Sequence, residues 1–327
     1  MTLILERYPI DYRCEIVGEI MKHIQNGECF ALIGLAGAGK SNLINFAKER
    51  EVIRHYLPAE LSESTQLLLL NGRSEGASRE KLYQAMQNRL QELGASSEAK
   101  GDALNTLRST LKGICAQQRI VFVIDEFEYL IQRQPVDFFD ELRDLRDDHR
   151  TSRNLLFLIV THRLPHAIEE GTAFEKSKLF ELFRDHYYPL QPYRQRDGDA
   201  MLDVLIQRAK LPALPAETRQ TLLSYSGGHS GLLYALFYEQ TPQFQLSEPK
   251  AMLAQSQKLR DANDTIWIHL HREEQEALKT VVQGGTIDVN MTQFLVKRGL
   301  VQKNAPTTLF CPLFEAYIRT IEITSTR

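Results

Sequence analysis

Short apolar runs alternate in the first half of the chain with longer stretches in which apolar residues recur every three or four positions. Five runs have the length of a strand buried on both faces, at 29–33, 66–71, 120–124, 154–160 and 186–190. Helical stripes come before or between them, at 16–24, 42–48, 82–93, 104–114 and 136–147. Strands that alternate with helices predict an α/β fold in which helices cover both faces of a parallel sheet.

The strand pattern stops at about residue 194. Three helices are expected after it, at 195–210, 214–225 and 229–240. The stretch 241–263 contains Pro242 and Pro249 and is the best candidate for a linker.

The last segment predicts two helices, a hairpin and a closing helix. The helices are expected at 273–282 and 291–298, and the hairpin at 300–303 and 308–311. This order is the outline of a winged helix. The expected organisation is a P-loop core at 1–193, a helical lid domain at 194–245, a linker at 246–263 and a winged-helix domain at 264–327.

The first predicted strand is followed by a G-x-x-x-x-G-K-S loop, the phosphate-binding loop of P-loop nucleotide-binding proteins. Its glycines permit backbone angles that a Cβ would forbid, so successive N–H groups can turn toward a phosphate. Lys40 can reach the β- and γ-phosphates, and Ser41 offers a hydroxyl to Mg²⁺. The candidate nucleotide contacts here are Gly34, Leu35, Ala36, Gly37, Ala38, Gly39, Lys40, Ser41 and Asn42.

Two acids follow the apolar run 120–124, at the end of a strand where ligands bind in open α/β sheets. We assign Asp125 to the Mg²⁺ shell and Glu126 to the orientation of the attacking water. The alternative for Glu126 is a simple exposed residue after a strand.

The run 154–160 ends in Thr161-His162-Arg163. A polar residue at this strand end would lie between the acids and the γ-phosphate, so Thr161 is a candidate sensor. Arg163 is a candidate cation for transition-state charge, with a solvated loop arginine as the alternative. His162 and His166 lack metal-ligand spacing and are interpreted as ordinary loop residues.

Composition limits the other functions. The chain has 327 residues and a net charge of −3, so no global basic field points to nucleic acid or an anionic membrane. The four cysteines form no C-x-x-C pair, which favours a reduced, cytoplasmic protein. No apolar run approaches the length that spans a bilayer.

The loop, the paired acids, the Thr161 strand end, the helical lid and the winged helix follow one another in the order of a known clade. The chain resembles the STAND ATPases and their relatives among archaeal-type and origin-recognition AAA+ ATPases, over roughly residues 8–325. The resemblance implies ATP and Mg²⁺ as ligands. Thr161-His162-Arg163 is similar to the family's T-x-R signature, whose arginine is expected near the γ-phosphate.

Three further residues enter through this resemblance. Tyr225–Gly231 is similar to a lid motif that normally reads Gly-Gly-x-Pro, with Ser230 at the proline position, and it brings His229 toward the nucleotide. Arg13 occupies the place of an arginine that flanks the base. Arg184 precedes the fifth strand, where some relatives carry an arginine finger that acts in trans; the alternative is a helix-surface arginine.

Three functions remain open at this point. The leading hypothesis is a slow ATPase that switches conformation or assembly and acts on a separate effector protein or on itself. The second is a DNA-acting ATPase, with Lys297, Arg298 and Lys303 as candidate contacts. Residues 264–327 contain seven basic and seven acidic residues, however, a poor balance for phosphate contacts. The third is a kinase for a small molecule, for which no acceptor pocket is evident.

Overall fold

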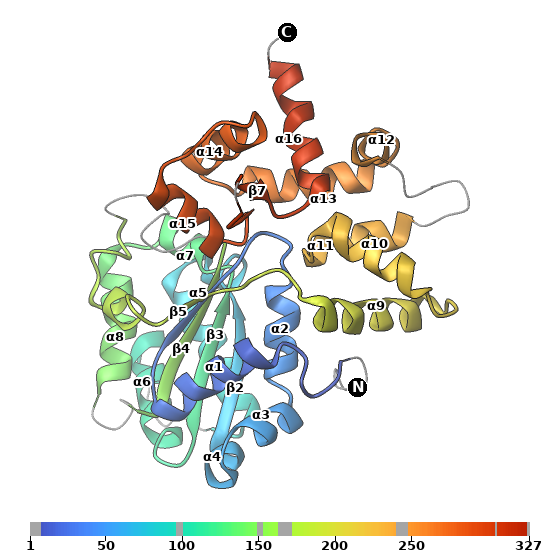
Figure 1. Cartoon of the computed structure of the whole chain (residues 1–327). Helices are drawn as coiled ribbons and strands as arrows, with labels where there is room; N and C mark the ends of the chain where they lie inside the picture. Colours follow the sequence, from blue (N-terminus) through green and yellow to red (C-terminus); the bar gives the residue numbers. More distant parts are fainter. Residues whose placement is uncertain are drawn as a thin grey trace.

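The computed structural model describes residues 8–95, 101–148, 153–162, 172–239, 248–304 and 306–325. Its first part alternates strands and helices: α1 (Cys14–Asn26), β1 (Phe30–Ile33), α2 (Lys40–Ala47), α3 (Arg50–Tyr56), α4 (Ala59–Ser64), β2 (Thr65–Asn71), α5 (Arg79–Glu92), α6 (Ala103–Ile114), β3 (Arg119–Asp125), α7 (Glu128–Arg133), α8 (Val136–Asp147), β4 (Leu155–Thr161) and β5 (Tyr187–Pro189) (Figure 1). The five predicted strands are therefore present, and the short helices α3, α4 and α7 are additions to the prediction.

The strands form one parallel sheet in the order β2-β3-β4-β1-β5. This confirms the predicted α/β fold with a parallel sheet. Because β3, β4 and β1 are neighbours, the residues that follow them meet at one edge of the sheet. The predicted acids, the Thr161 strand end and the phosphate loop all lie at that edge.

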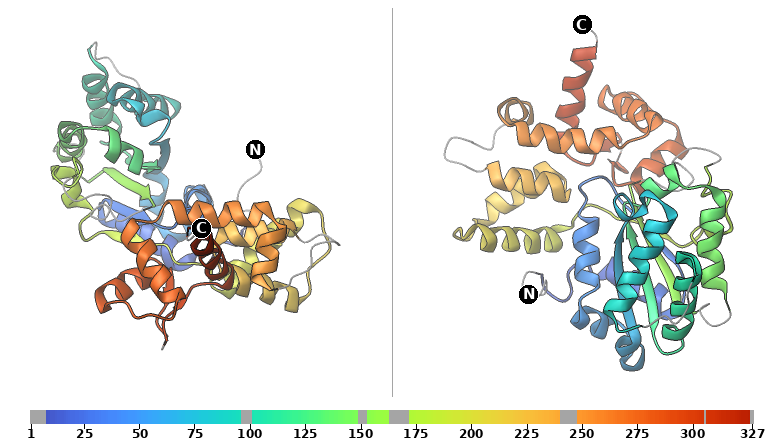
Figure 2. Two further views of the ribbon diagram at one scale, coloured as in Figure 1. Left: turned by 90° about the horizontal axis from the view of Figure 1, so that it is seen from above. Right: turned by 180° about the vertical axis from the view of Figure 1, so that it is seen from behind.

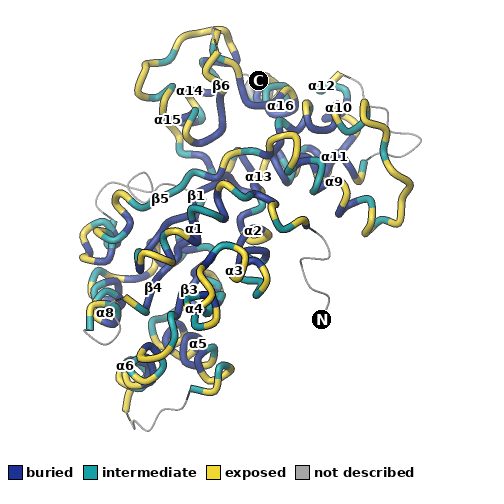
Figure 3. The backbone as a smooth tube through the Cα atoms, turned by 60° about the horizontal axis from the view of Figure 1, so that its bottom comes forward, coloured by how far each residue is buried: buried dark blue, intermediate teal, exposed yellow. Residues whose placement is uncertain are grey.

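Helices cover both faces of the sheet, and the side-chain alternation along β3 shows why. Val121 and Val123 face a core shared with α1, α2 and α3, whereas Ile120, Phe122 and Ile124 face a core shared with α5 to α8. Successive side chains of a strand point to opposite faces, so a continuous apolar run fills both cores. Figure 3 shows the strands β1, β3 and β4 as mostly buried and the outer helices with exposed stretches.

The second part of the chain is helical except for one hairpin. It contains α9 (Gln195–Ala209), α10 (Ala216–Ser226), α11 (Ser230–Glu239), α12 (Pro249–Gln255), α13 (Gln257–Ile268), α14 (Arg272–Val282), α15 (Val289–Lys297), β6 (Val301–Gln302), β7 (Thr308–Leu309) and α16 (Pro312–Ser325). The lid helices α9 to α11 and the C-terminal helices lie at the carboxyl ends of the strands (Figures 1 and 2). None of the described helices has the length and apolar character needed to cross a membrane.

Helices make up most of the expected linker and of the C-terminal segment. Most of the described part of 246–263 is helical, because α12 and α13 bury Met252, Leu253 and Leu259. The order of α14, α15, the β6–β7 hairpin and α16 agrees with the elements expected at 264–327. The domain boundaries and the winged-helix assignment remain predictions.

Candidate nucleotide-binding site

The phosphate loop connects the buried strand β1 to the N-terminus of α2. Gly37 and Gly39 have φ of 75° and 86°, values that favour glycine because a Cβ would be strained there. Among the described residues, the backbone amides of Gly37, Gly39, Lys40 and Ser41 have no hydrogen-bond acceptor. Unbonded amides at a helix N-terminus are the groups that bind a phosphate, so the backbone is suited to an anion.

The lid lies directly against this loop, through the turn that begins α11. The His229 ring donates from Nε2 to the Ala36 carbonyl at 3.0 Å, and the Gly231 amide donates to the Gly37 carbonyl at 2.9 Å. Burial lowers the pKa of His229 to about 4, which keeps the ring neutral. His229 thus contacts the loop backbone, and its predicted role toward a nucleotide remains a prediction.

A pocket of about 540 Å³ opens between the loop, the sheet edge and the lid. The core supplies Gly37, Gly39, Lys40, Ser41, Asn42, Asn71, Asp125, Glu126 and His162, and the lid supplies Met201, Ser230, Gly231 and Tyr234. The structure therefore brings five of the predicted loop residues and both predicted acids to one cavity, whereas Gly34, Leu35, Ala36 and Ala38 do not line it. The N-termini of α2 and α11 both reach its wall, and their partial positive charges favour an anion.

Lys40 lies at the bottom of the pocket with its ammonium group enclosed by acceptors. Its Nζ donates to the Gly34 carbonyl at 2.8 Å and to the Leu35 carbonyl at 2.9 Å, and it lies 3.0 Å from His162 Nδ1. Burial lowers the pKa of Lys40 to about 8, although nearby carboxylates oppose the shift. A phosphate that reached Lys40 would favour its charged form and would compete with these three acceptors.

Ser41 and Asp125 supply the oxygen atoms expected for a magnesium site. The Ser41 hydroxyl donates to Asp125 Oδ2 at 2.6 Å. A hydroxyl and a carboxylate at this separation fit the preference of Mg²⁺ for hard oxygen ligands that leave room for water and substrate phosphates. The bound ion would neutralise part of the phosphate charge, and Ser41 and Asp125 would hold it.

Glu126 is held by a residue that the sequence analysis did not identify. The Asn71 side chain, at the end of β2, donates from Nδ2 to Glu126 Oε2 at 2.8 Å. Asn71 Oδ1 in turn accepts from the amides of Arg73 and Ser74, which fixes the orientation of the amide group. Glu126 has a φ of 54°, an unusual conformation for a residue other than glycine. Asn71 therefore controls where the candidate catalytic carboxylate points.

His162 belongs to the site, contrary to its interpretation as an ordinary loop residue. An ammonium group has no lone pair, so His162 Nδ1 must be the acceptor toward Lys40. The protonated nitrogen is then Nε2, which lies 2.9 Å from Glu128 Oε1. Burial lowers the pKa of His162 and so supports a neutral ring, which connects Lys40 to Glu128.

The C-terminal segment reaches the same strand end through Arg298. Arg298 Nη1 donates to the His162 carbonyl, and its Nε donates to Glu274 Oε1 at 2.9 Å. The Arg298 and Glu274 side chains are only 3% and 4% exposed. Arg298, a candidate DNA contact, is therefore not accessible to DNA in this conformation, because its guanidinium group is buried. Lys297 and Lys303 are exposed.

The remaining predicted residues lie outside the pocket. Thr161 is fully buried, and its carbonyl accepts from the Gly34 amide at 3.1 Å, so the following residue, His162, is the one that faces Lys40. Arg163 lies outside the described residues. The roles predicted for Thr161 and Arg163 remain predictions.

Arg13 and Arg184 are also separate from the phosphate loop. Arg13 lines another hollow, of about 280 Å³, where it donates to the Gln191 carbonyl and stacks on the Tyr193 ring. Arg184 is exposed and precedes β5, at the opposite edge of the sheet from the loop. A role in trans for Arg184 and a base contact for Arg13 remain predictions.

The comparisons with known proteins agree with this architecture. Residues 23–168 match a family model described as an AAA domain, and this segment contains the phosphate loop and both acids. The fold of this part is therefore that of a P-loop nucleotide-binding domain, and it is similar to AAA domains. A search of curated proteins gives no match.

Solved structures match nearly the whole chain. The crystal structure of Cdc6p from Pyrobaculum aerophilum matches with a TM-score of 0.50 and 14% identity, covering 98% of this chain and 96% of that one. A Walker-type ATPase of Pyrococcus abyssi matches with a TM-score of 0.57 and 14% identity, covering 94% and 95%. At this identity the comparison establishes a common fold, including the helical region after the sheet.

Proposed function

We propose that the protein is a Mg²⁺-dependent ATPase whose bound nucleotide sets the position of its C-terminal segment. The observation that carries the proposal is the continuous connection from Lys40 through His162 to Arg298. Lys40, the residue proposed to bind phosphate, and Arg298, a member of a buried ion pair of the C-terminal segment, thus both contact His162.

Binding would act on this connection through Lys40. In the described conformation, Lys40 Nζ is bound to two loop carbonyls and to His162. A γ-phosphate is a stronger partner for an ammonium group than a neutral imidazole, since the hydrogen bond has two charged members. Lys40 would turn to the phosphate, and His162 would lose one of the contacts that hold it. The contact of its carbonyl with Arg298 would weaken in consequence.

Hydrolysis would require a second change, at Glu126. Asn71 donates to the carboxylate of Glu126, so this oxygen is not available to orient a water molecule. We infer slow turnover, because the carboxylate must leave Asn71 before it can act. Slow turnover suits a protein that must remain loaded to keep one conformation.

The test compares nucleotide binding with assembly state. We expect Mg-ATP to bind both the wild type and Glu126→Gln in calorimetry, and to be hydrolysed by the wild type but not by Glu126→Gln. Lys40→Ala should lose binding. Elution on a sizing column should differ between ADP and a nonhydrolysable ATP analogue in the wild type but not in Lys40→Ala. Identical elution and equal turnover in all samples would refute the proposal.

A DNA-acting ATPase is the second candidate. It is favoured by Lys297 and Lys303, which are both exposed, at the end of α15 and at the hairpin. A titration of a DNA duplex at rising salt decides between the two, because phosphate contacts make the affinity fall steeply with salt. Binding that weakens in a Lys297→Ala, Lys303→Ala variant would support this function. No binding at low salt, with either nucleotide, would eliminate it.

A further inference from the structure

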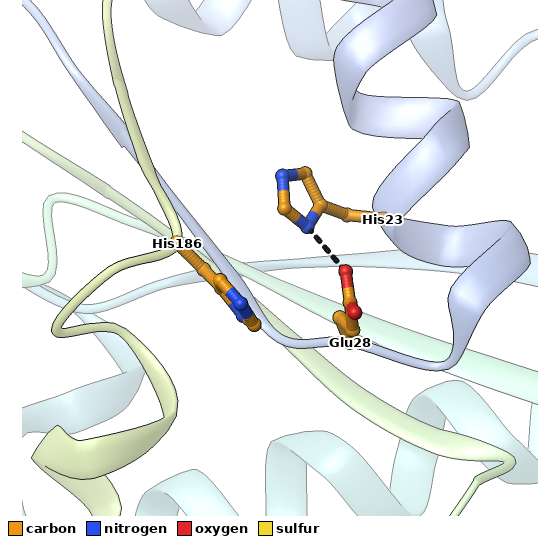
Figure 4. Close-up of side chains that lie close together, drawn as sticks. All are labelled: His23, Glu28 and His186. Carbon is orange, nitrogen blue, oxygen red and sulfur yellow. Dashed lines mark hydrogen bonds and ion pairs between the residues drawn. The ribbon is translucent and has the colours of Figure 1, made fainter.

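A cluster of two histidines and one glutamate lies at the edge of the sheet opposite the phosphate loop. His23 is in the last turn of α1, Glu28 comes just before β1, and His186 comes just before β5 (Figure 4). Their ligand atoms all lie within 4.8 Å of one another, and His23 Nδ1 is 2.9 Å from Glu28 Oε2. We propose that His23, Glu28 and His186 form a binding site for a divalent transition-metal ion such as Zn²⁺.

The backbone holds the three residues in place before any ion binds. The Glu28 amide donates to the His23 carbonyl at 2.9 Å, and the Ala31 amide donates to the His186 carbonyl at 2.9 Å. The His23 ring stacks on Phe30 with centroids 4.6 Å apart, and it lies 5.1 Å from the His186 ring. Secondary structure therefore fixes the backbone positions of the three residues, and the buried Phe30 ring orients the His23 ring.

The separations suit a zinc ion after a small adjustment of side chains. Zinc–nitrogen and zinc–oxygen bonds of about 2.0–2.2 Å at tetrahedral angles place neighbouring ligand atoms roughly 3.4 Å apart. The observed separations, from 2.9 Å to at most 4.8 Å, include this value. Two imidazoles and one carboxylate leave a fourth position for water. Nitrogen ligands favour zinc and its neighbours over Mg²⁺ or Ca²⁺.

Carboxylates and one guanidinium group lie around the cluster. The carboxylates of Glu28 and Glu19 act on His23, and the Arg146 guanidinium group donates to the carbonyl of Gly27, the residue before Glu28, at 3.2 Å. The His23 and Glu28 side chains are 18% and 36% exposed, which leaves a path for the ion.

A bound ion would join three elements, one of which leads at its other end into the nucleotide site. The start of α1 carries Arg13, the end of β1 leads into the phosphate loop, and the end of β5 leads to Tyr193. The proposed ion would thus stabilise the frame beneath that site. The proposed metal site does not depend on the proposed function, because metal binding is measured without nucleotide.

The test uses untagged full-length protein that has been freed of metal with a chelator. We expect one equivalent of Zn²⁺ in calorimetry, visible absorption typical of tetrahedral Co²⁺, and a rise in melting temperature on addition of Zn²⁺. His186→Asn should reduce the Zn²⁺ affinity at least tenfold and abolish the rise. This substitution leaves the His23–Glu28 hydrogen bond intact, so it separates a metal site from an ordinary ion pair.

The control is His55→Asn, at an exposed histidine of α3 outside the cluster, which should bind Zn²⁺ like the wild type. If His186→Asn does not fold, Glu28→Gln serves in its place. A wild type that binds neither ion stoichiometrically would overturn the proposal. So would a folded His186→Asn variant, or its Glu28→Gln replacement, with unchanged affinity.

Discussion

At the scale of single residues, the site depends on polar groups whose present partners differ from those they would have with a nucleotide. Lys40 is bound to Gly34, Leu35 and His162, and Glu126 is bound to Asn71. Each of these hydrogen bonds satisfies part of the bonding capacity of a polar group in the pocket. The groups of the site are therefore arranged for exchange of partners.

The lowered pKa of Lys40 gives the first prediction. Because that pKa is about 8 in the free protein, most molecules carry a neutral Lys40 at about pH 9. Phosphate favours the ammonium form and raises the pKa, so Mg-ATP binding at that pH should take up a proton, and affinity should fall as pH rises above 8. At about pH 6.5 the lysine is already charged, and no uptake by this group is expected.

Calorimetry in two buffers of different ionisation enthalpy measures this uptake. Lys40→Arg is the matched control, because a guanidinium group stays charged throughout the range. If the wild type and Lys40→Arg take up the same number of protons on binding, Lys40 is not the group that takes up the proton.

Asn71 gives the second prediction. Asn71→Asp keeps the oxygen that accepts from the Arg73 and Ser74 amides, but it removes the donor to Glu126 and repels its carboxylate. We expect the variant to fold and to hydrolyse ATP several-fold faster than the wild type, measured as phosphate release. Unchanged turnover with intact binding would show that Asn71 does not restrain Glu126.

At the scale of elements, the contact between lid and core depends on the turn before α11. Gly228 has a φ of 74°, and a Cβ on it would lie 2.2 Å from the Tyr193 carbonyl oxygen. The Tyr193 amide donates to the Gly228 carbonyl at 2.8 Å, so the two backbones lie side by side. This close approach positions His229 and Ser230 against the phosphate loop.

Gly228→Ala should therefore destabilise the protein far more than Gly94→Ala. Gly94 has a comparable φ of 82°, but a Cβ there would meet nothing within 4 Å, so it isolates the cost of the backbone angle. We expect Gly94→Ala to lower the free energy of unfolding by about 1–2 kcal/mol, from that angle alone. Gly228→Ala should lower the free energy of unfolding by several kcal/mol or displace the lid. Chemical denaturation measures the free energy of unfolding of both variants. Equal losses of stability would contradict the close approach of the two backbones.

The elements and the loop could be predicted from the sequence because their signals are local. The apolar runs predict the strands, and the eight-residue motif predicts Lys40 and Ser41. The contacts of His162 with Lys40, of Asn71 with Glu126 and of Arg298 with His162 join residues 122, 55 and 136 positions apart. No local pattern indicates such pairs. Arg298 resembled a DNA contact because a cation at the end of a helix is usually exposed, and only the fold shows Glu274 beside it.

At the scale of the whole molecule, core and C-terminal segment meet at the end of β4. Besides the Arg298 contact, the His269 ring lies 4.8 Å from the His162 ring. His269 ends α13, the helix that carries Trp267, and Trp267 packs near Phe314 and Lys279 of the C-terminal helices. A movement of the His162 ring would therefore reach the surroundings of Trp267 through the neighbouring His269 ring.

Trp267 is the only tryptophan of the chain, so its fluorescence tests the central claim directly. We predict that a saturating nonhydrolysable ATP analogue with Mg²⁺ shifts the emission of the wild type more than ADP does, and that Lys40→Ala shows no shift. Binding verified by calorimetry with unchanged Trp267 emission would contradict the account, because the nucleotide would then occupy the pocket without reaching the C-terminal segment.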